Sequence, residues 1–324
     1  MTVRWGLSSY PELLAELGIE RPLLVTSRRW ESLDLEAAKR FSGVRVHAPA
    51  DTVAAARAAA EGCDGLVAVG GGSAIDTAKA VSAKNGLRVV SVPTTYSGSE
   101  WTRIYGVRDE ERGVKTGGAA ANPVGIVYDV DLTLGLPAAE TGGTALNALA
   151  HCAEALYVSG RNPEADREAL AGARLISASL PAVLADGGDR GARRELLEGA
   201  MHAGAALAGA GLGLGHAMAQ ALGGRYGLAH GALNAVCLPP ALRFNEPVAA
   251  AEIERFGEAM STRDPVARTE ELARLAGFER LRDLGVPEHE LPLVAEATAV
   301  RGGAKANPRP ASPEEILQLL RSVW

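Results

Sequence analysis

The sequence predicts two domains of different class: an α/β domain with a parallel sheet over residues 1–136, and an all-α domain over residues 137–324. In the first part, short apolar runs alternate with helix-like segments, an alternation that implies parallel strands joined by crossover helices. After residue 136 the strand-like runs nearly disappear. The length of 324 residues, 47% of them hydrophobic, is sufficient for two cores.

The elements of the first domain follow in order along the chain. Strands are expected at 21–27 (RPLLVTS), 65–72 (GLVAVGGG) and 87–95 (LRVVSVPTT), and helices at 51–62 and 73–86. Polar residues cap helix starts and glycine ends helices, so we expect Asp51 or Thr52 to cap the first helix and Gly62 to end it.

The second domain begins with three long helical segments, at 136–160, 164–185 and 193–211. The Ala/Gly run at 203–215 is the nearest approach to a membrane span. It is shorter than the ~18 apolar residues that a span needs and is rich in glycine. We therefore expect an internal helix and turn there, and no membrane association.

Composition narrows the classes of partner. The net charge of −6 argues against nucleic acid, which selects basic surfaces. The three cysteines, Cys63, Cys152 and Cys237, are far apart and form no CxxC pair. The first residues lack the features of a signal peptide. We expect a cytoplasmic protein that acts on a small molecule.

A run of three glycines, Gly70, Gly71 and Gly72, separates a predicted buried strand from a predicted helix. Ser73 and Asp76 have the spacing of a capping box, so the helix is expected to begin at Ser73. Bare backbone at a helix N-terminus lets a pyrophosphate approach the unpaired N–H groups. The run predicts a dinucleotide phosphate site; the plainer alternative is a tight strand-to-helix turn.

Hydroxyl groups gather where the next strand ends, at Thr94, Thr95, Tyr96 and Ser97. Open α/β sheets bind ligands at the carboxyl ends of their strands. These groups are candidates for binding the ribose, phosphate or nicotinamide of a cofactor. An ordinary Ser/Thr/Gly loop is the alternative.

Three histidines lie in apolar helical segments. His151 follows Asn147 by one turn, Gln220 follows His216 by one turn, and His230 comes next. The three are expected to converge, either as metal ligands or as groups that hold a substrate. A metal normally takes a carboxylate, and Asn147 offers only a neutral amide; Glu154 lies one turn further along. Core or surface positions are expected for the remaining histidines, His47, His202 and His289.

These motifs resemble those of the iron-containing alcohol dehydrogenase superfamily: "GGGSAIDTAKA", "VPTTYSGSE", "NALAHCAEALY" and "GHAMAQALGGRYGLAHGALNAVCLP". Within it, "PTTYSGSEWT" and "VKTGGAAANPVGIVYDVDLTLGLP" are most similar to the maleylacetate reductases. The resemblance implies a dehydroquinate synthase-like fold, in which a dinucleotide-binding α/β domain precedes a helical domain. It also implies NADH or NADPH as cofactor, and a homodimer.

The resemblance further implies a reaction, the reduction of maleylacetate to 3-oxoadipate in the catabolism of aromatic compounds. Metal-dependent members hold iron or zinc at the positions of Asn147, His151, His216 and His230. Asparagine at the first of these is usual for maleylacetate reductases, which implies an enzyme without a bound metal.

Several positions depart from the maleylacetate reductase pattern. Gln220 stands where both branches usually carry a histidine, and glutamine cannot do acid–base work near neutral pH. Gly215 and Asn234 stand where maleylacetate reductases tend to have histidines, and Asp76 is typical of the dehydrogenases. The substrate can therefore differ from those of both branches.

The expected chemistry is hydride transfer to an electrophilic carbon, with a donor for the negative charge that develops. The candidate catalytic residues are His151, His216, His230, Asn147, Gln220 and Lys115. Lys115 and Arg243 are also candidate anchors for a dicarboxylate, with surface solvation as the alternative.

Ser27 stands at the end of the first strand, where NAD-preferring relatives often carry aspartate. With Arg28 and Arg29 beside it, nothing there repels a 2′-phosphate, so NADPH is expected to be accepted. Three other functions stay open: a metal-dependent alcohol or aldehyde dehydrogenase, a dehydroquinate synthase-like lyase, and an inactive nucleotide-binding homologue.

Overall fold

The computed structural model describes residues 1–109 and 114–324. They form two compact units, each described here by itself. The α/β unit comprises Met1–Thr95 and Ser99–Gly135, and the helical unit comprises Tyr96–Gly98 and Leu136–Trp324. The short segment Tyr96–Gly98 thus leaves the α/β unit directly after the candidate residue Thr95, and the chain crosses again after Gly135.

The α/β unit is built on a parallel sheet of six strands, in the order β1-β8-β5-β4-β2-β3. This confirms the predicted fold class. The strands are β1 (Thr2–Trp5), β2 (Pro22–Thr26), β3 (Lys39–Phe41), β4 (Gly65–Gly70), β5 (Arg88–Pro93) and β8 (Gly125–Tyr128). An antiparallel pair, β6 (Ile104–Asp109) and β7 (Val114–Ala119), forms a separate two-stranded sheet.

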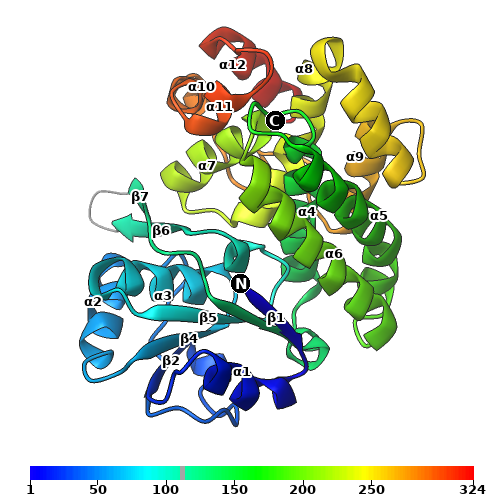
Figure 1. Ribbon diagram of the computed structural model, residues 1–324. Helices are drawn as coiled ribbons and strands as arrows, with labels where there is room; N and C mark the ends of the chain where they lie inside the picture. Colours follow the sequence, from blue (N-terminus) through cyan, green and yellow to red (C-terminus); the bar gives the residue numbers. More distant parts are fainter. Residues whose placement is uncertain (110–113) are drawn as a thin grey trace. The chain divides into compact units, whose positions relative to one another are not determined.

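Helices cover both faces of the parallel sheet (Figure 1). Side chains alternate along each strand, so Leu24 packs with α1 (Tyr10–Glu16), whereas Leu23 packs with α2 (Ala50–Ala59) and α3 (Gly72–Asn85). Burial on both faces explains the continuous apolar runs that predicted these strands.

The predicted cap of α2 was wrong. The helix begins at Ala50, and its N-cap is Pro49, which makes no side-chain capping bond. Asp51 instead lies in the first turn, where its carboxylate pairs with Arg45.

The helical unit contains the long helices that the sequence predicted, with several shorter ones near the C-terminus (Figure 1). They are α4 (Ala138–Ala155), α5 (Pro163–Ala185), α6 (Arg190–Ala210), α7 (Leu214–Tyr226), α8 (His230–Ala259), α9 (Pro265–Leu275), α10 (Leu291–Ala299), α11 (Gly302–Ala306) and α12 (Pro313–Ser322). Among the described residues, α5 alone is long and apolar enough to cross a membrane, by length and composition only. It packs against α4 and α6 as a core helix.

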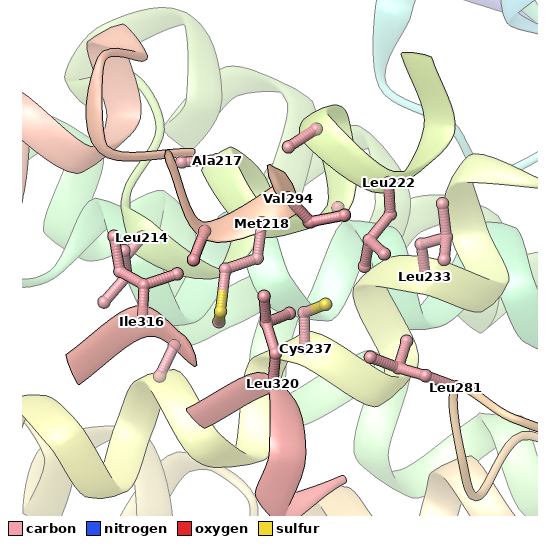
Figure 2. Close-up of a cluster of buried hydrophobic side chains, with 14 of the residues drawn as sticks. Leu214, Ala217, Met218, Leu222, Leu233, Cys237, Leu281, Val294, Ile316 and Leu320 are labelled. Atoms are coloured by element: carbon pink, nitrogen blue, oxygen red, sulfur yellow. The ribbon is translucent and has the colours of Figure 1, made fainter. Parts of the chain in front are cut away.

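Figure 2 shows the core that holds α7 in place. Leu214, Met218 and Leu222 recur along one side of α7 and pack against Cys237 of α8 and Leu320 of α12. The spacing of four residues puts all three α7 side chains on one stripe. The opposite side of α7 is therefore left for other contacts, and His216 lies outside this core stripe.

Candidate active site

The glycine turn joins β4 to α3. Gly70 has φ of 147°, a conformation that favours glycine, and Gly71 is the N-cap residue of α3. A Cβ on Gly71 would lie 2.9 Å from Cγ2 of Thr95, so the turn leaves no room for a side chain there. The arrangement leaves bare backbone before the first N–H groups of a 14-residue helix.

The predicted capping box at the start of α3 was wrong. The helix begins one residue before Ser73, and no side chain caps it. The Ser73 hydroxyl instead accepts a hydrogen bond from the backbone N–H of His47 at 3.0 Å. Asp76 accepts from the Ser99 hydroxyl at 2.7 Å and from the Gly106 N–H at 3.0 Å. Asp76 thus ties α3 to the segment that follows β5.

The strand order places the glycine turn at a reversal in the sheet. From β2 the chain goes to β3 on one side, whereas from β4 it goes to β5 on the other. Ligands of open α/β sheets bind at the carboxyl ends of the strands beside such a reversal. Gly70 ends β4, and Ser27 follows β2 directly, so both candidate residues lie at this edge.

The hydroxyl-rich segment after β5 divides between the two units. Thr94 donates its N–H to the carbonyl of Gly70 at 3.1 Å, which joins it to the glycine turn. The Thr95 and Ser97 hydroxyls are buried and have no hydrogen-bond partner among the described residues. The Tyr96 hydroxyl accepts a hydrogen bond from the buried Arg193 at 3.2 Å. Two hydroxyls of the segment therefore remain available to a ligand.

The structure brings the three candidate histidines together in the helical unit. His151 comes from α4, His216 from α7 and His230 from the first turn of α8. The rings of His151 and His216 are stacked, with centroids 4.7 Å apart, and those of His216 and His230 are 5.8 Å apart. The packing of α4 with both α7 and α8 holds the cluster.

The Asn147 amide lies at the centre of this cluster. Its Nδ2 donates to the Ser97 carbonyl at 3.1 Å, and its Oδ1 lies 3.3 Å from Nε2 of His216. The same Oδ1 accepts a hydrogen bond from Nδ2 of Asn234 at 2.7 Å. Nδ2 of Asn234 also lies 3.0 Å from Nε2 of His230. The two amides thus link all of the elements that carry the histidines.

Glu154 was not among the residues chosen from the sequence, although it lies on the same face of α4 as Asn147 and His151. Its carboxylate accepts from Nδ1 of His216 at 2.7 Å and from the backbone N–H groups of Gly213 and His216 at 2.6 and 3.0 Å. It is fully buried. The spacing of seven residues from Asn147 was the available signal. Glu154 both fixes the His216 ring and satisfies the N-terminus of α7.

His151 is a neutral imidazole in this setting. Burial, followed by the proximity of His216 and His230, lowers its pKa well below the ordinary value. Its Nε2 lies 3.4 Å from the Nδ2 donor of Asn147, which assigns the proton to Nδ1. That Nδ1 is buried with no partner within the described part of the chain.

The remaining candidates lie elsewhere or are only partly described. Gln220 lies on α7, one turn beyond His216. The backbone of Lys115 lies in β7, and its side chain is outside the described residues. Arg243 pairs with Glu270 and lines a surface hollow that none of the three histidines lines. His202 pairs with Glu168, and His289 is exposed.

The residues present do not fit a divalent metal ion. The Asn147 oxygen is a neutral donor and already accepts from Asn234, while Glu154 is used on the far nitrogen of His216. Within residues 1–109 and 114–324, no group of three or more His, Cys, Asp or Glu side chains could hold a metal. Divalent metals in such sites are held by charged or strongly donating ligands.

Comparison with known proteins covers both units. Residues 4–130 match the iron-containing alcohol dehydrogenase family, and residues 141–324 match the C-terminal domain of the Fe-containing alcohol dehydrogenase family. The maleylacetate reductase of Burkholderia cepacia is 38% identical, over 99% of this chain and 95% of the relative. That of Sphingobium indicum is 39% identical, over 86% of this chain and 80% of the relative.

Solved structures of proteins from the same family also superpose on this chain. A maleylacetate reductase from Agrobacterium tumefaciens superposes with a TM-score of 0.91 at 32% identity, covering all of this chain and 95% of the other. An iron-containing alcohol dehydrogenase from Corynebacterium glutamicum gives a TM-score of 0.92 at 30% identity, with 100% and 94% covered. Together with the glycine turn and the histidine cluster, these matches show that the chain belongs to the iron-containing alcohol dehydrogenase family.

Proposed function

We propose that the protein reduces an unsaturated oxo acid with two carboxylates, with maleylacetate as the substrate to test, and uses NADH or NADPH without a bound metal. The observation that carries the proposal is the Asn147 amide at the centre of the histidine cluster, which accepts from Asn234 where a metal site needs a free, charged ligand. Support also comes from the two maleylacetate reductases at 38% and 39% identity.

The residues of the α/β unit suit a dinucleotide. Gly70, Gly71 and Gly72 put no side chain between a pyrophosphate and the N-terminus of α3, and the partnerless Thr95 hydroxyl lies beside Gly71. Ser27 carries no charge to repel a 2′-phosphate, so we propose that NADPH is accepted along with NADH. The reduced nicotinamide, when bound, supplies a hydride.

The residues of the helical unit are candidates for stabilising the negative charge of the reaction and for donating a proton. Hydride addition to a C=C bond conjugated with a carbonyl produces an enolate, whose oxygen needs a donor and whose carbon needs a proton. The buried Nδ1–H of His151 is a neutral donor for the oxygen. A proton on Nε2 of His216 gives an imidazolium stabilised by the Glu154 carboxylate, and this imidazolium is the candidate acid.

Asn234 sets the tautomer of His230. Because the Asn234 amide presents an N–H group to Nε2 of His230, that nitrogen accepts and Nδ1 carries the proton. In this arrangement Asn147 orients the histidines of two helices and binds no metal.

The test follows NADH and NADPH oxidation at 340 nm with maleylacetate and with simple aldehydes. Turnover of maleylacetate well above that of the aldehydes is the expected result. Turnover of aldehydes alone would contradict the proposal and favour an alcohol or aldehyde dehydrogenase. Tightly held NAD with no net oxidation would favour a lyase.

A further inference from the structure

Arg301 precedes α11 in the helical unit and has no ion-pair or hydrogen-bond partner for its guanidinium among the described residues. Its Nε is buried, and burial lowers the pKa of the guanidinium. Three other arginines of this unit that are at least half-buried are paired: Arg255 with Asp166, Arg268 with Glu271, and Arg193 with four oxygen atoms. A partly buried cation without a counterion is costly unless a ligand supplies the negative charge.

The segment around Arg301 lies along α7. The backbone of Gly303 approaches the Gly213 carbonyl so closely that no side chain fits between them, and Gly303 also faces Ala217. Nη2 of Arg301 lies 3.7 Å from the position that a Cβ on Gly224 would take. Arg301 and α11 therefore cover a stripe of α7 that runs from its first residues to its last turn.

Helix geometry places Gln220 on this stripe. Ala217, Gln220 and Gly224 are separated by three and four residues, so they lie above one another at about 100° per residue. His216 lies about 40° further round the same helix, on the side of Gln220. The Gln220 side chain is half-buried and makes no hydrogen bond to the described residues that would hold it elsewhere. Gln220 thus stands between the histidine cluster and the Arg301 side of α7.

From this juxtaposition we infer that Arg301, with Gln220 beside it, forms a carboxylate-binding subsite that takes the carboxylate remote from the reacting carbons of an oxo-acid substrate. The inference rests on the proposed function. A guanidinium binds a carboxylate through two parallel N–H groups, and an amide adds a third donor. Gly224 and His216 are eight residues apart, about 12 Å along the helix. Nη2 of Arg301 lies beside Gly224, so the guanidinium would take the end of the ligand that is remote from the histidines.

A structural role is the competing explanation. Gly224 lies in the last turn of α7, and a cation there also stabilises the helix dipole. Such a role predicts that removing the charge lowers thermal stability and leaves substrate discrimination unchanged.

The experiment compares wild type with Arg301→Gln, Arg301→Lys and the control Arg321→Ala, an exposed arginine of α12. KM is measured for maleylacetate and for an unsaturated ketone without a remote carboxylate. For Arg301→Gln we expect KM for maleylacetate to rise about 10- to 100-fold, as for a lost hydrogen-bonded charge pair, with kcat within about twofold. The lysine variant recovers part of the loss, and the neutral ketone is unaffected.

A second readout does not depend on turnover. Calorimetric binding of adipate, a six-carbon dicarboxylate, is measured with oxidised cofactor present. Binding to wild type that is lost in Arg301→Gln supports the subsite even when maleylacetate is not reduced, so failure of the proposed function is distinguished from failure of this inference. Equal binding to both proteins, no binding to wild type, or equal losses for dicarboxylate and neutral ketone would overturn it.

Discussion

Replacing Glu154 by glutamine tests how the structure holds His216. The carboxylate accepts three hydrogen bonds, with two donors at Oε2 and one at Oε1. A glutamine can keep its oxygen at the Oε2 position, but its NH₂ then faces the backbone N–H of His216. That buried donor loses its partner, and the two remaining bonds lose the assistance of the charge.

The cost follows from these contacts. One unsatisfied buried donor costs about 1–3 kcal/mol, and loss of charge at the other two bonds brings the total to about 3 kcal/mol. The equilibrium constant for unfolding should then rise about a hundredfold. The variant weakens the hydrogen bond that orients the His216 ring and removes the charge beside it, so kcat should fall by about a hundredfold, the lower range for a general acid.

Urea unfolding followed by circular dichroism at 222 nm reports mainly on the helical unit, because most helices lie there. Steady-state turnover reports on the histidine. The control is Glu290→Gln, which removes a half-buried carboxylate at the surface that pairs with Arg225, and it should change much less. A Glu154→Gln variant with the wild-type urea midpoint and wild-type kcat would refute the role assigned to Glu154.

Three further predictions concern the cofactor site and the histidines. Ser27→Asp should lower the ratio of kcat/KM for NADPH to that for NADH by about fivefold to tenfold through repulsion of the 2′-phosphate; an unchanged ratio counts against it. Gly71→Ala should raise the Kd of NADH at least about tenfold, because the added Cβ meets Thr95 and blocks the approach of the phosphate. The Kd is measured by fluorescence titration, and wild-type affinity would exclude the glycine turn as the phosphate site. The pKa of His151 in the folded protein is depressed below the ordinary histidine value of 6.5. Below pH 6.5 the unfolded chain therefore binds a proton at this residue that the native state does not bind, and the free energy of unfolding falls as the pH falls. In urea titrations from about pH 8 to about pH 5, His151→Gln should flatten this slope, and an unaltered slope would contradict a neutral buried His151.

The sequence was most informative where burial leaves a simple pattern. The runs at β2, β4 and β5 are apolar throughout because helices cover both faces of the sheet. Strands β1, β3 and β8 were not predicted, since each has only three or four residues and β3 is the exposed, charged stretch Lys39–Phe41. Their pairing depends on neighbours distant in sequence.

The candidate site was predictable in its residues but not in its connections. The spacing of Asn147 and His151 indicated a shared helix face, and the structure joins that face to His216. The incorrect capping box shows why spacing alone is an insufficient guide to hydrogen bonding. Asp76 has the spacing of a capping box, but its carboxylate accepts hydrogen bonds from Ser99 and Gly106, which are distant in sequence. Arg301 carries no motif, and only the packing of its segment on α7 reveals it.

The central claim is that Asn147 and the histidines act without a metal, and one measurement tests it most directly. The purified protein is stripped with a chelator, its metal content is determined, and NADH oxidation with maleylacetate is followed before and after addition of iron or zinc. The account predicts full turnover by the stripped protein, with no gain from either metal. Turnover that disappears with the metal and returns with it would contradict the account.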